Sequence, residues 1–467
     1  MKKLTIEHLW IITVLGICFG YVVSMPIDQY DFWHYIKTGM ITLTTHKIVD
    51  KEIFTFTAFD TPYINLHWLS QIYYFLLYKI GGLEILAFSH AVIITLTFII
   101  VFLLAYKHSN NLKISSFVTL LTMALSVTNF ALRPQEFSIL FFALTLFFLK
   151  TNRLFLIPLL FVLWANFHGA FIIGLLLVGI ECLGSLKLKY FVTLAFSILA
   201  TLLTPWGLKL YQSVLNVESE NFANLVSEWY PPTIHEQAGF IFFSMLLFLF
   251  ILQNFRKQSL SRLELLTLVV FTLLALHSQR AIIWWAIVVS PIFASSFKEL
   301  FFEKLKSKSD EKENFIVNWV FVILFICYSV SSLPWFKTNN ILLPKIKRDL
   351  IASNTPVKLT SFLAKSKNCN KIFNNFAWGS YFMWGLNDSQ KIFVTPWLSV
   401  FSKDIVQDYL LVSGGNALWE DILNKYKTNC LALDNEEQKR LIPLVQKSND
   451  WIKVYEDKQG VVFKKSN

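Results

Sequence analysis

Long apolar runs alternate with short polar segments over the first 336 residues of the chain. Each run holds roughly 16 to 24 residues, the length that an α-helix needs to cross the hydrocarbon of a bilayer. The runs are rich in Phe, Leu and Ile and carry almost no charge. The pattern predicts eleven spans, placed to within a few residues, at 8–25, 85–106, 114–130, 135–149, 154–167, 169–186, 190–206, 239–254, 264–279, 281–297 and 315–336.

Two apolar segments near the N-terminus need separate interpretation. The first run follows Lys2 and Lys3 as in a signal peptide, but no small-residue cleavage site comes after it, so we predict an uncleaved helix. Segment 67–80 is short and has polar edges. We predict a helix that lies in the membrane interface, with Trp68, Tyr73, Tyr74 and Tyr78 at the level of the headgroups.

The composition changes after Phe336. Short apolar runs there alternate with helix-like stretches near 357–366, 402–412, 416–427 and 436–447, a pattern typical of a small α/β domain with a mainly parallel sheet. The last residues predict a hairpin that turns at Asp457 to Gly460. The fold class is therefore an α-helical polytopic membrane protein of about eleven spans at 1–336, with a first outer loop at 26–84, followed by an α/β domain at 337–467.

The formal net charge of +11 is distributed as membrane topology predicts. With the N-terminus inside, the inner segments hold most of the Lys and Arg, whereas the short outer loops carry only Arg133, Lys209 and Arg280. Residues 337–467 then lie outside, and the spans place the chain in a membrane with lipids around it. No segment resembles a nucleic-acid-binding module, so nucleic acid is not an expected partner.

The five cysteines give little chemistry. Cys18, Cys182 and Cys327 lie inside apolar runs, where packing is their expected role. Cys369 and Cys430 fall in the polar tail, and a disulfide between them could form in an oxidising compartment, which the sequence leaves open. No cysteine spacing matches a metal site.

Polar residues other than lysine collect on the outer side in this topology. Scattered polar residues in a membrane protein should not all choose one side unless something there needs them. They are Asp28, Asp31, His34 and His67 in the first outer loop, Arg133, His168, Glu228, His277 and Arg280.

These side chains suit phosphate and hydroxyl chemistry. Asp28 and Asp31 are three residues apart and would share one helix face with Tyr35 and Thr38. A carboxylate at a dry interface can act as a general base, and two of them can hold a divalent metal such as Mg or Mn against a phosphate. Arg133 and Arg280 could bind phosphate oxygens bidentately.

Plainer interpretations exist for every one of these residues. The aspartates could cap an interfacial helix, and the arginines could anchor helices at the headgroups. Each histidine could be a packing residue, and Glu228 could cap a helix or pair with an arginine. Taken together, these interpretations do not explain why so many polar residues share one side of the membrane.

A series of short motifs runs along the chain in a fixed order. They are D-Q-Y-D-F-W-H-Y-I-K-T-G at 28–39, P-Y-I-N-L-H-W-L-S-Q at 62–71, Y-K-I-G-G-L-E at 78–84, L-R-P-Q at 132–135, W-A-N-F-H-G at 164–169, T-P-W-G-L-K-L-Y at 204–211, S-E-W-Y-P-P at 227–232 and F-N-N-F-A-W-G-S-Y at 373–381. In order and spacing they resemble the bacterial polytopic glycosyltransferases of the GT-C fold class, which use polyprenyl-phosphate sugars as donors.

The resemblance implies an aspartate base in the first outer loop, inside a cavity that faces away from the cytosol. The family signature is D-x-D or E-x-D, whereas this chain has D-x-x-D. Asp31 matches the second acidic position best, and Asp28 becomes a candidate for holding a metal or orienting the donor.

The expected enzyme is a hexosyl- or pentosyltransferase of inverting mechanism in the bacterial cytoplasmic membrane. It would move a sugar from a polyprenyl-phosphate donor to a hydroxyl of a glycan, lipid or protein acceptor of the cell envelope. Arg133 and Arg280 should line the same cavity as Asp28 and Asp31. His34, His67, His168, Glu228 and His277 complete the predicted substrate-binding set.

Two alternatives stay open at the level of sequence. A ligase or polymerase that takes a polyprenyl-diphosphate glycan would use the same residues. A transporter, flippase or assembly protein would place charged residues near the bilayer midplane, often with inverted repeats. The chain has no internal repeat, and its charges lie at one rim.

Overall fold

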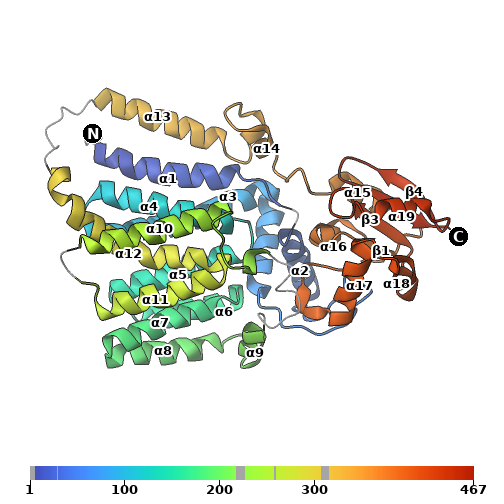
Figure 1. The fold of residues 1–467 in the computed structure, drawn as a ribbon, viewed down its shortest axis with the longest axis horizontal. Helices are drawn as coiled ribbons and strands as arrows, with labels where there is room; N and C mark the ends of the chain where they lie inside the picture. Colours follow the sequence, from blue (N-terminus) through green and yellow to red (C-terminus); the bar gives the residue numbers. More distant parts are fainter. Residues whose placement is uncertain (1–5, 29, 217–226, 257–258, 307–314, 467) are drawn as a thin grey trace. The chain divides into compact units, whose positions relative to one another are not determined.

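The structure is a computed structural model that describes residues 6–28, 30–216, 227–256, 259–306 and 315–466. The chain forms two compact units, each assembled from separate stretches of sequence (Figure 1). The helical unit combines Met1–Met25, Gly81–Val214 and Ala223–Leu350, and the mixed unit combines Pro26–Ile80, Leu215–Phe222 and Ile351–Asn467. No single cut in the sequence separates them, because the first loop belongs with the C-terminal residues.

The helical unit is a bundle of apolar helices. α12 packs against α4 and α11, α1 packs against α4 and α13, and α8 packs against α6 and α7 (Figure 1). The helices are α1 (Ile6–Ser24), the second part of α3 (Trp68–Ser109), α4 (Leu112–Ser126), α5 (Gln135–Lys150), α6 (Leu156–Phe167), α7 (Phe171–Ser185), α8 (Leu188–Thr201), α9 (Lys209–Asn216), α10 (Gln237–Asn254), α11 (Arg262–His277), α12 (Ile282–Lys306), α13 (Phe315–Ser331) and α14 (Lys345–Arg348).

Each of the eleven predicted spans coincides with a helix, but their number as membrane crossings is not confirmed. Among the described residues, four helical segments are long and apolar enough to cross a bilayer: Trp68–Ser109, Leu112–Asn129, Gln237–Asn254 and Gln279–Leu300. The other helices with apolar sequences are shorter. The run predicted at 190–206, for example, forms a helix only as far as Thr201.

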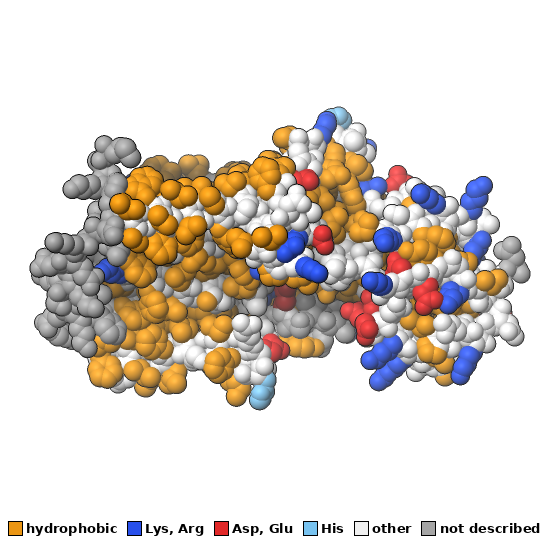
Figure 2. Space-filling model, turned by 90° about the horizontal axis from the view of Figure 1, so that it is seen from above, with side chains coloured by type: hydrophobic (Ala, Val, Ile, Leu, Met, Phe, Trp, Pro, Cys, Tyr) orange, Lys and Arg blue, Asp and Glu red, His pale blue; other side chains and the backbone are white. Residues whose placement is uncertain are grey.

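The outside of the helical unit is apolar, as expected of a protein that lies in a membrane. Figure 2 shows a face covered with hydrophobic side chains over these helices. On α8, for example, Leu188, Phe196 and Leu199 are exposed. In water such a continuous apolar surface would be unfavourable, whereas acyl chains solvate it at no cost. The chain is therefore a membrane protein.

The longest helix, α3, contains a break. Gly81 (φ −156°, ψ 30°) and Gly82 (φ 68°, ψ −157°) leave the helical region, and the positive φ of Gly82 is one that residues with a Cβ rarely adopt. The break divides α3 between the two units, with residues up to Ile80 in the mixed unit. Segment 67–80 is thus helical from Trp68, and its position at the membrane interface stays a prediction.

The mixed unit is built around a five-stranded sheet with the strand order β2-β1-β3-β5-β4. β1 (Lys371–Asn374) pairs in parallel with β2 (Lys391–Ile392) and β3 (Cys430–Asp434). β5 (Gly460–Lys465) is antiparallel to both β3 and β4 (Trp451–Glu456). The predicted hairpin is confirmed, but the mainly parallel sheet is wrong, because that hairpin adds two antiparallel pairings to the two parallel ones.

Among the described residues, this unit also contains the first part of α3 and the helices α2 (Phe32–Thr45), α15 (Val357–Lys365), α16 (Gly379–Gly385), α17 (Lys403–Ser413), α18 (Trp419–Lys425) and α19 (Ile442–Lys447). The helix predicted at 436–447 begins later than expected, at Ile442, with Pro443 in its first turn. A disulfide joins Cys369 to Cys430 on β3, so the pairing that the sequence left open is present in the structure.

The first loop is part of this unit's fold. Thr55 pairs in parallel with Ile392 of β2, and the backbone N–H of Ile392 donates to the carbonyl of Phe54 at 3.0 Å. Ile27 pairs with Ile351, and Ala58 is buried in the core beneath the sheet. Residues 54–56 therefore pair with the edge of the sheet at β2.

Candidate functional site

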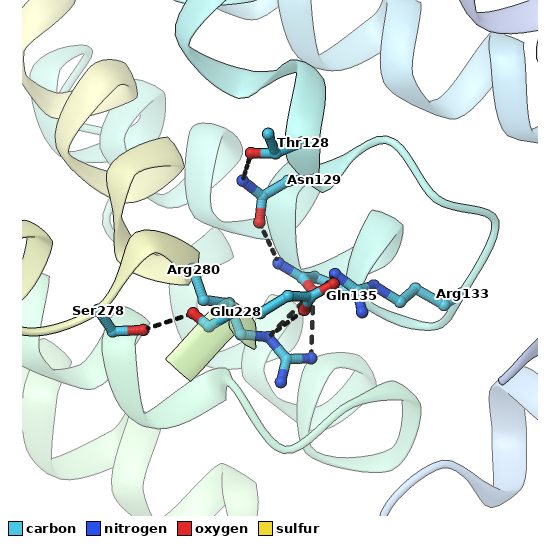
Figure 3. A network of polar contacts seen from close by, with 7 residues as sticks. All are labelled: Thr128, Asn129, Arg133, Gln135, Glu228, Ser278 and Arg280. Atoms are coloured by element: carbon cyan, nitrogen blue, oxygen red, sulfur yellow. Dashed lines mark hydrogen bonds and ion pairs between the residues drawn. The ribbon is translucent and has the colours of Figure 1, made fainter. Parts of the chain in front are cut away.

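Two arginines and a glutamate meet in the helical unit, as Figure 3 shows. Arg133 donates from Nη2 to Oε2 of Glu228 at 2.9 Å, and Nε of Arg280 lies 3.9 Å from the same oxygen. We call these three residues the arginine cluster. They lie far apart in the sequence, and the sequence analysis singled out all three.

A short chain of amides supports the arginine cluster. Nε and Nη2 of Arg280 both donate to Oε1 of Gln135, at 3.3 and 3.2 Å. The amide of Gln135 in turn donates to Asn129 at 2.9 Å. The guanidinium of Arg280 also lies 5.2 Å from the ring centroid of Trp229, within the range of a cation–π contact. Arg280 is therefore held on three sides.

The ends of helices position these residues. Arg133 precedes Pro134 at the N-terminus of α5, where proline's fixed φ suits the start of a helix. Glu228 lies in the 3-10 turn η4 (Ser227–Trp229), and its carbonyl accepts from the hydroxyl of Ser278 at 3.1 Å. Arg280 lies in η5 (Gln279–Ala281), between α11 and α12. Two helix ends and the turn η4 thus bring the charges together.

The cluster joins two guanidinium groups to one carboxylate. Burial by itself raises the pKa of the Glu228 carboxyl, but the charges of Arg133 and Arg280 and the hydrogen bond from Arg133 outweigh burial and leave that pKa below its usual value. Glu228 is therefore ionised at neutral pH. Guanidinium is the side chain that binds phosphate oxygens in pairs, so Arg133 and Arg280 carry donors that suit an oxyanion.

The other two residues predicted on this unit differ in their surroundings. Nδ1 of His168 accepts from the backbone N–H of Ala170 at 3.2 Å and is 2.7 Å from Oγ of Ser138, which itself accepts from Trp164. These bonds fix the ring of His168 against α5. His277, the last residue of α11, is exposed, and the structure gives it no contact with the arginine cluster among the described residues.

A buried pair that the sequence analysis missed lies next to the cluster. Nδ1 of His90 bonds to Glu136, and Nε2 bonds to the carbonyl of Phe130 at 2.8 Å. A carbonyl only accepts, so Nε2 carries a proton. Glu136 follows Gln135 directly on α5, so this pair ties α3 to the helix end that carries the cluster. A histidine inside an apolar run was the signal that could have indicated it.

The two aspartates belong to the mixed unit. α2 begins at Phe32, with Asp31 as its N-cap residue and Asp28 before it, so the predicted common helix face is wrong. The helix begins only after Asp31, so Asp28 lies outside it. The carboxylate of Asp31 accepts no capping hydrogen bond. The carbonyl of Asp28 accepts from Nε1 of Trp33 at 2.8 Å.

His34 and His67 join an aromatic group in the same unit. The ring of His34 is 3.9 Å from that of Tyr35 and 5.2 Å from that of Trp397, and His67 is 6.2 Å from Trp397. The backbone N–H of His34 donates to Ser380 at 3.0 Å, so the motif at 28–39 meets the motif at 373–381. Burial, together with the neighbouring His67, lowers the pKa of His34 to about 3. Its ring is thus neutral and packed.

A divalent metal would need more ligands than the aspartates provide. Mg takes six oxygen ligands in most sites, and Asp28 and Asp31 supply two carboxylates. Among the described residues, no group of three or more His, Cys, Asp or Glu side chains could hold a metal ion. Mg is commonly held by one or two carboxylates, with waters and substrate phosphate oxygens as its other ligands, so metal dependence stays a prediction.

The structure thus sorts the predicted residues into two sets. Arg133, Glu228 and Arg280 are in direct contact in the helical unit, whereas Asp28, Asp31, His34 and His67 are in the mixed unit. The expectation that both arginines line one cavity with both aspartates stays a prediction.

Comparisons with known proteins identify the fold. No known protein-family pattern and no curated protein sequence matches the chain. Among solved structures, it resembles the archaeal oligosaccharyltransferase AglB from Archaeoglobus fulgidus in complex with an inhibitory peptide and a dolichol-phosphate, with a TM-score of 0.59 and 11% identity. It also resembles the apo form of the Archaeoglobus fulgidus oligosaccharyltransferase, with a TM-score of 0.58 and 11% identity. Both matches cover 98% of this chain and 74% of the other. The chain therefore shares the fold of these oligosaccharyltransferases.

Proposed function

We propose that the protein is a membrane glycosyltransferase that moves a sugar from a polyprenyl-phosphate donor to an acceptor hydroxyl on the outer face of a bacterial cytoplasmic membrane. The observation that carries the proposal is the arginine cluster, which gathers two guanidinium groups around Glu228, one before α5 and one between α11 and α12. The fold shared with an oligosaccharyltransferase that binds a dolichol-phosphate supports the same kind of donor.

The arginine cluster suits the leaving group of this reaction. When the acceptor oxygen attacks the anomeric carbon, the bond from that carbon to the donor phosphate oxygen breaks, and the phosphate leaves with the electron pair. Positive charge fixed beside the phosphate stabilises the negative charge that develops on it. Gln135 and Trp229 hold Arg280 in place, so little reorganisation is needed when the donor arrives.

Asp31 is our candidate for the base that takes the hydroxyl proton of the acceptor. It stands directly before α2 and is the second acidic residue of the D-x-x-D motif in the first loop. Attack from the face opposite the phosphate would invert the anomeric carbon. Asp28 is the candidate for orienting the donor. No step in this mechanism uses a metal.

Donor binding tests the proposal directly. We expect Arg280→Lys and Arg133→Lys to weaken the binding of decaprenyl phosphate at least tenfold, because lysine keeps the charge but loses the paired donors. The dissociation constant would be measured by native mass spectrometry of the purified protein in detergent. Arg262→Lys is the matched control, since Arg262 is exposed at the start of α11.

Activity assays with a panel of polyprenyl-phosphate hexoses and pentoses, and with the matching diphosphate-linked glycans, would separate the monophosphate enzyme from a diphosphate ligase. Unchanged decaprenyl phosphate binding in both arginine variants would contradict the assigned role of the cluster. It would leave the arginines as structural residues of the bundle.

A further inference from the structure

A cavity of about 470 Å³ lies in the mixed unit, away from the aromatic group around His34. Its walls come from one face of α2, the segment 53–59 of the first loop, and α16 with the residues that follow it to β2. Most of the wall is apolar and includes Met40, Ile41, Phe54, Phe382 and Met383. Its volume lies in the range of small-molecule sites, roughly 300 to 1,000 Å³.

One part of the cavity wall is charged. Lys37 from α2 and Lys391 from β2 both line it, and so does Asp388. Nζ of Lys37 lies 3.2 Å from Oδ1 of Asp388, and Nζ of Lys391 donates to the carbonyl of Ile53 at 2.7 Å. The three side chains together carry one surplus positive charge.

The ammonium groups are costly to keep there. The side chain of Lys37 is only 11% exposed, whereas that of its partner Asp388 is 92% exposed, so the ion pair reaches from a buried cation to a solvated anion. Burial lowers the pKa of Lys391, and the charge of Lys37 lowers it further against the opposing effects of Asp388 and Glu52. Each ammonium has three N–H donors and one protein acceptor among the described residues.

We propose that this cavity binds an anionic amphiphile, that is, a phosphate or carboxylate carried on a hydrocarbon chain. The headgroup would contact Lys37 and Lys391, and the chain would lie along Met40, Ile41, Phe54 and Phe382. This site is separate from the arginine cluster, which belongs to the helical unit, and the proposal does not depend on the proposed function.

The residues that line the cavity do not suit other classes of ligand. A free sugar needs many hydrogen-bonding groups around it, and here the apolar side chains predominate. Two ammonium groups repel a metal cation. A short anion without a chain would leave the apolar wall in contact with water. An anionic amphiphile satisfies both parts of the wall, and a membrane protein has such molecules at hand.

The Asp388 carboxylate would then compete with the headgroup of the ligand for Lys37. It pairs with the Lys37 ammonium when no ligand is bound, and because the carboxylate is almost fully solvated, breaking this ion pair costs little free energy. Opposite effects follow for the two partners of one ion pair. Asp388→Asn should tighten binding of the amphiphile about fivefold, and Lys37→Gln should weaken it at least tenfold.

The probe for the test is octyl phosphate, added to the full-length protein in a non-ionic detergent and followed by native mass spectrometry. Lys358→Gln is the matched control, because Lys358 is exposed on α15 outside the cavity. Arg280→Lys should leave this binding unchanged, which separates the cavity from the proposed donor site. Asp388→Asn retains Lys37, so its result counts even if Lys37→Gln folds poorly.

Two reference ligands sharpen the test. Octyl glucoside has the chain without the charge, and inorganic phosphate has the charge without the chain, so each should bind at least tenfold more weakly than octyl phosphate. If phosphatidate in phosphatidylcholine nanodiscs competes with octyl phosphate, the natural ligand is a bilayer lipid. If phosphatidate does not compete, the natural ligand is a soluble amphiphilic acid. Equal binding of either reference ligand, or no response to Lys37→Gln and Asp388→Asn, would overturn the proposal.

Discussion

Asp31 stands at the start of α2 without capping it, and this is the residue whose chemistry matters most to the proposed reaction. We expect Asp31→Asn to lower glycosyl transfer by about 100-fold or more, the scale of general-base catalysis, because the amide keeps the shape and loses the base. Binding of the donor should change much less. Turnover and donor affinity would be measured on the same preparation.

Two comparison variants make the result specific. Asp60→Asn is the control, since Asp60 is an exposed residue of the same loop that pairs with Lys51. If Asp28→Asn is inactive while Asp31→Asn is active, the roles of the two aspartates are exchanged. If both keep full activity, the base is another residue.

His34 predicts an acid-sensitive mixed unit. The pKa of about 3 in the folded protein lies below the value of about 6.5 expected when the chain unfolds. Below pH 6.5 the unfolded chain therefore binds a proton that the folded chain does not, and stability falls as pH falls, down to about pH 3. The slope is at most about 1.4 kcal/mol per pH unit for one group.

Thermal unfolding in detergent between pH 7 and 4.5 would measure this loss. We expect His34→Phe to flatten the pH dependence, because the aromatic ring still fills the space beside Tyr35 and Trp397 without titrating. His277→Gln, at an exposed position, should behave like the unmodified protein. An unchanged slope in His34→Phe would assign the acid sensitivity to other groups.

Which functional residues the sequence could indicate depended on the residue types that surround each of them in the sequence. Arg133 and Arg280 stood out because the short outer loops carry few charges, and Glu228 stood out because it lies on the same predicted side. Gln135 and Asn129 did not, since a neutral amide near a helix end carries no such signal, yet they hold the cluster together. The pair of His90 and Glu136 depends on the packing of α3 against α5, which no local pattern encodes.

At the scale of elements, the positions of the helices could be predicted from the sequence, but the residues at which they begin, break and end could not. Apolar runs give the helices their positions, since each run must bury its backbone hydrogen bonds. The break in α3 depends on two glycines whose torsion angles only the surrounding structure fixes. The sheet was expected to be mainly parallel because strand–helix alternation dominated the pattern, and the C-terminal hairpin then supplied half of the pairings.

Gly39 marks the closest approach of α2 to α3 within the mixed unit. A Cβ at this position would lie 2.1 Å from the carbonyl oxygen of Gln71 and 3.1 Å from Cβ of Phe75. We expect Gly39→Ala to destabilise the mixed unit by about 2 kcal/mol or more, because backbone must move. The measurement is the melting temperature together with the rate of limited proteolysis in the mixed unit.

The matched control is Gly179→Ala on α7, where a Cβ would meet no atom within 4 Å. Alanine favours a helix over glycine by roughly 1 kcal/mol, so this variant should be neutral or slightly stabilising. A melting temperature for Gly39→Ala equal to that of the unmodified protein would show that α2 and α3 are less tightly packed than described.

At the scale of the whole molecule, the predicted membrane topology can be tested directly. The bias of Lys and Arg predicts residues 337–467 on the outer side, and the disulfide between Cys369 and Cys430 fits an oxidising compartment. In a variant without native free cysteines, a probe at Lys458 should react with an impermeant maleimide in intact cells. A probe at Lys308, which lies outside the described residues, should react only after lysis. The reverse pattern would place the predicted constellation in the cytosol.

The participation of the first loop in the mixed unit also sets an order on the synthesis of the protein. Ile27 and Thr55 leave the ribosome early, but their partners Ile351 and Ile392 are made last. The mixed unit therefore closes only when the chain is complete, and until then Phe54 and Ala58 lack the surfaces that cover them. Chains that stop before residue 351 would present this unpaired edge to proteases and to one another. This unpaired edge would thus distinguish incomplete chains from complete ones.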